Sequence, residues 1–197
     1  AGAGMAALAV FSLAWKKGIT PIRLVLIGIG VQALMSGIIT MLIVLSPTYS
    51  TIEAYIWLTG SVYGADWGDV RALLPWVLVF VPAAVLLSRV ISVQELGDDL
   101  AYGLGMRVQF NRLLMLFISV ALAGSAVAYA GGIGFIGLIA PHIARRLIGR
   151  SFGHLVPVSA LVGGMIVVSA DVMARTLFLP LDLPAGVFVS GVGAPFF

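Results

Sequence analysis

The sequence contains no cysteine and few charged residues. Its 197 residues include 11 Lys and Arg, 8 Asp and Glu and 2 His, and charged residues make up 10% of the chain. The lack of cysteine excludes disulfides, cysteine metal sites and thiol catalysis. A soluble domain carries about 25% charged residues, so this chain cannot supply a water-facing surface. We therefore interpret the net charge of +3 as a signal of membrane orientation and not of nucleic-acid binding.

The sequence also lacks the motif GxxxxGK[ST], which cradles nucleotide phosphates. Gly132, Gly134 and Gly137 match GxGxxG, but no strand precedes them and no acid follows about twenty residues later. Close packing of helices on glycine is the better explanation. His142 and His154 have no acid, nucleophile or further ligand at a suitable spacing. These patterns argue against a nucleotide site, a metal centre and an enzyme.

Apolar residues dominate what is present. They make up 61% of the sequence, and the mean hydropathy is +1.14. At roughly 20 apolar residues per crossing, this length allows about six or seven helices. The apolar runs lie at 1–14, 24–45, 73–93, 113–130, 133–143, 155–170 and from 185 onward. We predict an all-α polytopic membrane protein, and we expect the natural protein to extend beyond both ends.

The cations fix the predicted orientation. If the runs alternate in direction, nine of the 11 Lys and Arg residues fall on one side: Lys16, Lys17, Arg23, Arg89, Arg107, Arg112, Arg145, Arg146 and Arg150. The other side receives only Arg71 and Arg175, together with five acids: Glu53, Asp66, Asp69, Asp171 and Asp182. The positive-inside rule makes the first side cytoplasmic.

Two segments do not fit simple spans. In the external segment 46–71, we predict a short helix over 51–60, with Thr51 as N-cap, Glu53 in the first turn and Gly60 at the end. The run 133–143 is too short to cross the membrane alone, and Pro141 bends or breaks it. It therefore needs residues 145–148 or a position surrounded by protein.

The longest polar stretch on the cytoplasmic side is 95–112, ELGDDLAYGLGMRVQFNR. Two short helices fit it, over 98–103 and 107–111, separated by Gly105. An ordinary solvated loop is one interpretation. However, an apolar stripe of Leu96, Leu100, Ala101 and Leu104 outside the bilayer favours contact with a protein partner.

Two further polar patterns lie within the spans. Gly28, Gln32, Ser36 and Thr40 recur every four residues and predict a stripe along one helix face, suited either to helix packing or to the wall of a translocation path. Asp171 and Arg175 are four residues apart near an external helix end. They either neutralise each other or present Arg175 to a carboxylate of a protein that docks from outside.

Longer strings resemble one known family. GGIGFIGLIAPHIARRLIGRSFGHLVPVSALVGG, SADVMAR and LDLPAGVFVSGVGAPFF, together with LGDDLAYGLG, occur in the expected order. They resemble the FecCD family of ABC-transporter permeases, which import iron-siderophores, haem and vitamin B12. The resemblance implies about ten membrane helices per subunit, of which this chain looks like the fourth to the start of the tenth. It also implies a single permease domain over 1–197, with a cytoplasmic coupling loop over 94–112.

The resemblance also implies roles for individual residues. The coupling-loop positions that press into the ATPase are Leu96, Gly97, Asp98, Ala101, Leu104 and Gly105, although the family usually has Glu where Asp98 stands. Arg175 falls on an arginine that pairs with a glutamate of the binding protein. The helix of the polar stripe falls on a pathway helix. Pro21 and Ile22 replace a Thr-Ser pair near the inner gate, so no gate chemistry is carried over.

The expected function is that of a permease subunit in the cytoplasmic membrane, most simply for an iron-siderophore, with haem or vitamin B12 as alternatives. The expected partners are a second permease subunit, two cytoplasmic ATPases, an extracytoplasmic binding protein and the lipid bilayer. ATP and magnesium would belong to the ATPases, and no cofactor is expected in this chain. A secondary transporter would need a charged or broken-helix site at mid-membrane, and the spans carry no acid at that depth. A purely structural anchor would not explain the polar stripe.

Overall fold

The protein is described by a computed structural model, which covers residues 2–14, 21–94, 97–149, 152–177 and 183–196. The elements in these ranges are all helical and confirm the predicted all-α class. They are α1 (Gly2–Ala14), α2 (Pro21–Leu45), α3 (Thr48–Thr59), α4 (Trp67–Leu86), α5 (Ser88–Gln94), α6 (Asp98–Gly103), α7 (Val108–Ala130), α8 (Ile136–Ile148), α9 (Phe152–Leu177), α10 (Ala185–Gly193) and the 3₁₀ helix η1 (Ala194–Phe196). Stretches of α2, α4, α7 and α9 are long and apolar enough to cross a membrane.

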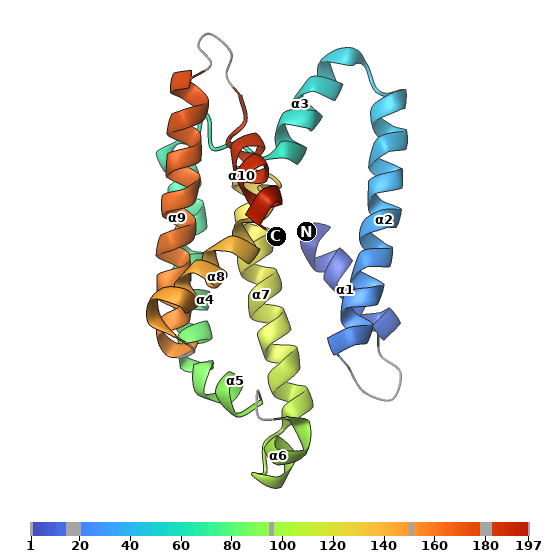
Figure 1. Cartoon of the computed structure of the whole chain (residues 1–197). Helices are drawn as coiled ribbons and strands as arrows, with labels where there is room; N and C mark the ends of the chain where they lie inside the picture. Colours follow the sequence, from blue (N-terminus) through green and yellow to red (C-terminus); the bar gives the residue numbers. More distant parts are fainter. Residues whose placement is uncertain (1, 15–20, 95–96, 150–151, 178–182, 197) are drawn as a thin grey trace.

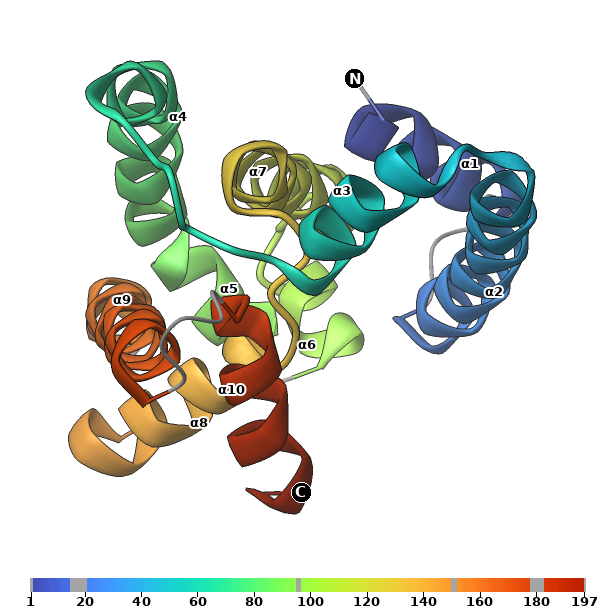
Figure 2. The same ribbon diagram turned by 90° about the horizontal axis from the view of Figure 1, so that it is seen from above.

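The helices form a main body and one outlying arm (Figure 1). In the body, α4, α8 and α10 pack against α9, and α7 packs against α4. The arm consists of α1, which contacts α7, and α2, which packs against α1. Figure 2 shows α2 at the far side of the molecule from α9. Within the part of the chain that the structure describes, no residue of Ile22–Leu45 is buried.

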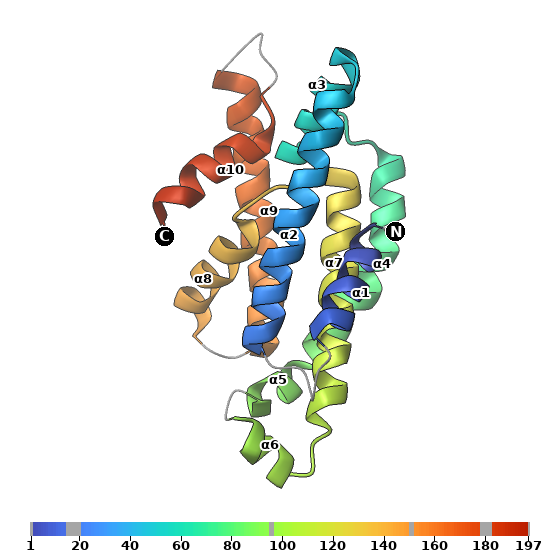
Figure 3. The same ribbon diagram turned by 90° about the vertical axis from the view of Figure 1, so that its right-hand side faces the viewer.

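The described cations named below lie at the ends that the sequence predicts, whereas Lys16, Lys17, Arg150 and Asp182 of the same prediction lie outside the described residues. The starts of α2 and α7 carry Arg23, Arg107 and Arg112, and the end of α8 carries Arg145 and Arg146, all toward the end of the molecule that holds α6 (Figure 1). The start of α4 and the end of α9 place Arg71 and Arg175 at the opposite end. Figure 3 shows α7 running from one end toward the other. We refer to the α6 end as the inner end and to the α3 end as the outer end.

The helix predicted over 51–60 begins earlier than expected. It starts at Thr48 with Pro47 as its N-cap, and the Thr51 hydroxyl donates to the Pro47 carbonyl, 3.2 Å away. Thr51 therefore lies inside the helix, and its prediction as the N-cap, with Glu53 in the first turn, is wrong. Proline has a fixed φ and no N–H to satisfy, so a helix starts readily beside it. The predicted end at Gly60 is confirmed, since Gly60 is the C-cap with φ 85°.

Two other predicted boundaries also change. The run 73–93 is broken at Leu87 into α4 and α5, where α5 turns to pack against α9 and the Ser88 hydroxyl lies close to Gly153. The predicted short helix over 107–111 is not a separate element, because Arg107 is the N-cap of α7, which then continues without a break to Ala130. Residues 145–148 continue the helix that begins within the run 133–143, as expected, and Pro141 lies inside α8 without ending it.

Three segments meet at the outer end through backbone hydrogen bonds. Ser61 N–H donates to the Ala130 carbonyl at 2.9 Å, Gly132 N–H to the Trp57 carbonyl at 3.2 Å, and Gly186 N–H to the Gly60 carbonyl at 3.0 Å. These bonds join the end of α3, the end of α7 and the start of α10. We call residues 57–61, 130–133 and 185–186 the glycine junction.

The junction requires residues without side chains. A Cβ atom on Gly186 would collide with the Thr59 carbonyl oxygen, and one on Gly131 would collide with that of Trp57. A Cβ on Gly132 would lie 2.9 Å from the Leu58 carbonyl oxygen. The predicted close packing is therefore confirmed for Gly132. It does not extend to the other two glycines of the pattern: a Cβ on Gly134 would lie 3.8 Å from the nearest atom, and one on Gly137 would have none within 4 Å.

Small residues also bring the body helices together. Ala140 and Ala144 of α8 are buried, and a Cβ on Gly163 of α9 would lie 3.5 Å from the Cβ of Ala140. Further along α9, Ala170 forms a core with Ala185 and Val189 of α10. Close approach on small side chains is the usual means of helix association in membranes, where lipid is as apolar as the protein.

Substituting Gly186 by alanine should destabilise the fold, because the new methyl group would displace the end of α3. We expect a loss of about 1–3 kcal/mol, as for overpacked cores. The measurement is the unfolding midpoint of the full-length protein in detergent. Gly191→Ala is the matched control in the same helix, since a Cβ there meets nothing within 4 Å. Equal midpoints for the two variants would contradict the tight junction.

Candidate functional site

The predicted coupling positions lie on and around α6. Gly97 and Gly105 flank this short helix with φ values of 110° and 77°, which glycine adopts without strain. Gly97 accepts a hydrogen bond from Ala101 N–H at 3.1 Å, and Gly105 N–H donates to the Tyr102 carbonyl at 2.9 Å. Asp98 is the first residue of α6, and Leu96 lies outside the described residues. We call residues 97–105 the coupling segment.

The apolar residues of the coupling segment do not share one surface. Leu100 and Leu104 are 59% and 68% exposed, whereas Ala101 is fully buried. The Ala101 carbonyl accepts from Met106 N–H at 3.0 Å, just before the equally buried Val108 of α7. Ala101 therefore supports the segment from within and does not present its side chain to a partner, which corrects the role predicted for it. Leu100 and Leu104 form the apolar surface at the inner end.

The polar stripe lies on α2. Gln32, Ser36 and Thr40 are exposed, whereas Gly28 is half-buried. Leu24, Ile27 and Val31 are half-buried as well, and α1 is the helix against which α2 packs. Gly28 therefore belongs to the packed side of α2, and the other three residues to its open surface. The Thr40 hydroxyl donates to the Ser36 carbonyl at 2.9 Å, which keeps it within the helix.

The external pair forms as the sequence predicts. Arg175 Nε lies 2.9 Å from Asp171 Oδ2, one turn apart near the outer end of α9. The Arg175 side chain remains 44% exposed, and that of Asp171 is 18% exposed. We call these two residues the docking pair.

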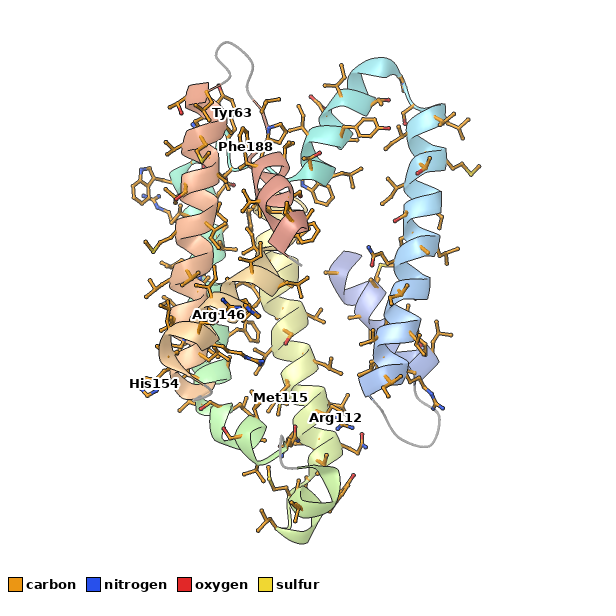
Figure 4. The ribbon with its side chains drawn as sticks, in the orientation of Figure 1. Tyr63, Arg112, Met115, Arg146, His154 and Phe188 are labelled. Carbon is orange, nitrogen blue, oxygen red and sulfur yellow. The ribbon has the colours of Figure 1, made fainter. Side chains whose placement is uncertain are left out.

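Sequence reasoning missed a third member of this site. The Arg175 guanidinium carbon lies 5.0 Å from the centre of the Tyr63 ring, a cation–π contact. Figure 4 shows Tyr63 at the outer end, beside the end of α9. Tyr63 belongs to the segment between α3 and α4, far from Arg175 in sequence. The sequence offers one sign of this contact: Arg175 stands on a predicted external face that otherwise carries mainly acids, so its charge is expected to have further partners.

The described residues contain no cluster of three or more His, Cys, Asp or Glu side chains that could hold a metal ion. His142 lies on α8, and His154 lies near the inner end of α9 (Figure 4). Within the described residues, the side chains predicted to function lie on three surfaces: the coupling segment, the polar stripe and the docking pair, which Tyr63 joins. All three suit contact with other molecules.

Comparison with known proteins gives a family. Residues 1–197 match the FecCD transport family. The chain is 54% identical over 196 residues to the achromobactin transport system permease protein CbrC of Dickeya dadantii, covering 100% of this chain and 56% of that protein. It is 43% identical over 197 residues to the iron(3+)-hydroxamate import system permease protein FhuG of Bacillus subtilis, covering 100% of this chain and 59% of that protein. The chain thus spans little more than half the length of these relatives.

A solved structure agrees with these matches. A transporter assigned to the metal-chelate type of ABC transporter, in an inward-facing conformation, superposes with a TM-score of 0.90 at 30% identity. The match covers 100% of this chain and 62% of that one. Together with the apolar spanning helices, these findings identify the chain as a multi-pass membrane protein that belongs to the FecCD transport family.

Proposed function

We propose that the full-length protein is the permease subunit of an ABC importer that carries an iron-siderophore across the cytoplasmic membrane. The observation that carries this proposal is the 54% identity, over the whole chain, to a permease of the achromobactin transport system. The likeness to a metal-chelate type transporter, with a TM-score of 0.90, supports it.

Each proposed partner has a separate role in transport. A second permease subunit completes the path, two cytoplasmic ATPases bind ATP and magnesium, and an extracytoplasmic binding protein delivers the chelate. The sequence lacks the phosphate-cradling GxxxxGK[ST] motif, so we assign ATP hydrolysis to the ATPase chains. Closure of the ATPases would drive alternating access through the coupling segment.

In cells that lack their own copy, the full-length gene should restore uptake of a radioiron-labelled ferric siderophore. Haem and cobalamin uptake, measured in parallel in the same cells, are the controls for substrate class. Restoration of cobalamin or haem uptake without iron uptake would contradict the siderophore assignment. Uptake that persists when the ATPase is inactivated would contradict the importer class.

The coupling segment is suited to receive the ATPase. Leu100 and Leu104 expose apolar surface at the inner end, where a protein partner can cover it. The Ala101 carbonyl and the buried Val108 tie the segment to α7. A displacement of the segment is therefore passed directly to a membrane-spanning helix.

Leu104→Asp should abolish uptake and reduce copurification of the ATPase, because a charge replaces the apolar contact. Leu104→Met keeps apolar area and volume and should retain both. Membrane insertion, measured by the amount of protein in the membrane fraction, should be equal in the two variants. Normal ATPase recovery together with normal uptake in Leu104→Asp would contradict the assignment of Leu104 to the ATPase contact.

The polar stripe is suited to line the path. Its Gln32 and Ser36 are exposed, as are the residues of α2 between them. Hydroxyl and amide groups give a polar solute hydrogen-bond partners without a charge that would trap it. Lipid would offer these groups nothing, so their natural neighbours are water, cargo or another polar chain.

Gln32→Leu combined with Ser36→Leu should block uptake without weakening capture of the binding protein. The matched variant Gln32→Asn with Ser36→Thr keeps the polarity of both positions and should still transport. Radioiron uptake and binding-protein capture are measured on the same preparations. Wild-type uptake in the double leucine variant would assign the stripe to helix packing alone.

We assign Arg175 to capture of the binding protein. It is a half-exposed cation on a predicted external face that otherwise carries mainly acids, and its pairing with Asp171 leaves part of the guanidinium accessible. Arginine suits contact with a carboxylate because its planar fork donates two parallel hydrogen bonds. A partly exposed charge of this kind affects association and its salt dependence more than resting stability.

A further inference from the structure

Two contacts among the described residues hold the guanidinium of Arg175. The group carries five N–H donors, one on Nε and two on each terminal nitrogen. Nε lies 2.9 Å from Asp171 Oδ2, so the single Nε–H is used within α9. Its Cζ lies over the Tyr63 ring, 5.0 Å from the ring centre. The two terminal nitrogens carry the other four N–H donors of the group.

Tyr63 is itself held by its neighbours in the chain. Its N–H donates to the Ser61 hydroxyl at 3.1 Å, and Ser61 N–H donates to Ala130 in the glycine junction. On the other side, Asp66 caps α4 by accepting from Gly68 N–H at 2.6 Å and from Asp69 N–H at 3.0 Å. The segment that carries Tyr63 is thus fixed to α7 at one end and to α4 at the other.

We propose that Tyr63 is a positioning residue for Arg175, which fixes the plane of the guanidinium so that its two terminal nitrogens meet a carboxylate of the incoming binding protein. The inference rests on the proposed docking role of Arg175. The contact with Asp171 sets the direction of the Nε–H bond. The contact with the Tyr63 ring sets the rotation of the guanidinium plane about the Nε–H direction. A guanidinium ordered before binding loses less conformational freedom when the partner arrives.

A purely structural role for Tyr63 makes a different prediction. If its ring only packed the outer segment, its loss would weaken docking whether or not Arg175 was present. If it acts through Arg175, its loss has no effect once the guanidinium is gone. A double-mutant cycle between the two residues separates these cases.

The experiment uses the full-length permease, assembled with its partner subunits in nanodiscs, and its purified extracytoplasmic binding protein. Arg175→Gln should raise the Kd roughly 10- to 100-fold, as expected for a lost charge-assisted hydrogen bond. Tyr63→Leu should raise the Kd roughly two- to fivefold, the range of an exposed cation–π contact. Tyr63→Phe keeps the aromatic face and should bind like the wild type. In the Arg175→Gln background, Tyr63→Leu should have no further effect.

The outcomes separate the two proposals. An unchanged Kd in Arg175→Gln overturns the docking role itself. A weakened Arg175→Gln beside an unchanged Tyr63→Leu leaves the docking role standing and overturns the positioning role. The positioning role also fails if Tyr63→Leu weakens binding equally in both backgrounds, or if Tyr63→Phe is as weak as Tyr63→Leu.

Discussion

The constraint on which the outer half of this structure depends is the direct pairing of backbone with backbone at the glycine junction. In a membrane, a backbone N–H or carbonyl without a partner costs several kcal/mol, and irregular backbone survives only where protein satisfies it. The junction satisfies six such groups, three N–H donors and three carbonyl acceptors, by bringing the ends of α3 and α7 and the start of α10 within hydrogen-bond distance. Gly131 and Gly186 make that approach possible. The position of the segment that carries Tyr63 follows from it.

The three surfaces proposed for transport have different supports. The docking pair lies on adjacent turns of α9, and Tyr63 beside it belongs to a segment fixed to the glycine junction. The coupling segment is held through the Ala101 carbonyl to Met106, two residues before α7 begins. The polar stripe lies on α2, which packs against α1 and buries none of its described residues. The rest of the α2 surface is mainly apolar and suits contact with lipid or with further protein. The relatives are nearly twice as long as this chain.

Much of the fold and part of the site could be predicted from sequence, for local reasons. Helical class follows from composition, the gathering of most described cations at one end follows from their spacing along the chain, and the contact between Asp171 and Arg175 follows from their i, i+4 spacing. The start of α3 was misplaced because threonine is a common N-cap, whereas the helix begins one turn earlier, after Pro47, without a side-chain cap. Ala101 was placed on the contact surface because periodicity gives a stripe but not the element that covers it. Tyr63 could not be found, because only the tertiary fold brings it to Arg175.

Helix α7 connects the two ends of the molecule without interruption. It begins beside the coupling segment and ends in the glycine junction, and its 23 residues span about 34 Å at 1.5 Å per residue. The coupling segment and the glycine junction therefore lie at the two ends of one continuous helix. In the proposed importer, thermodynamic reciprocity applies to two such sites: by whatever factor ATPase engagement changes the affinity for the binding protein, the binding protein changes the affinity for the ATPase by the same factor.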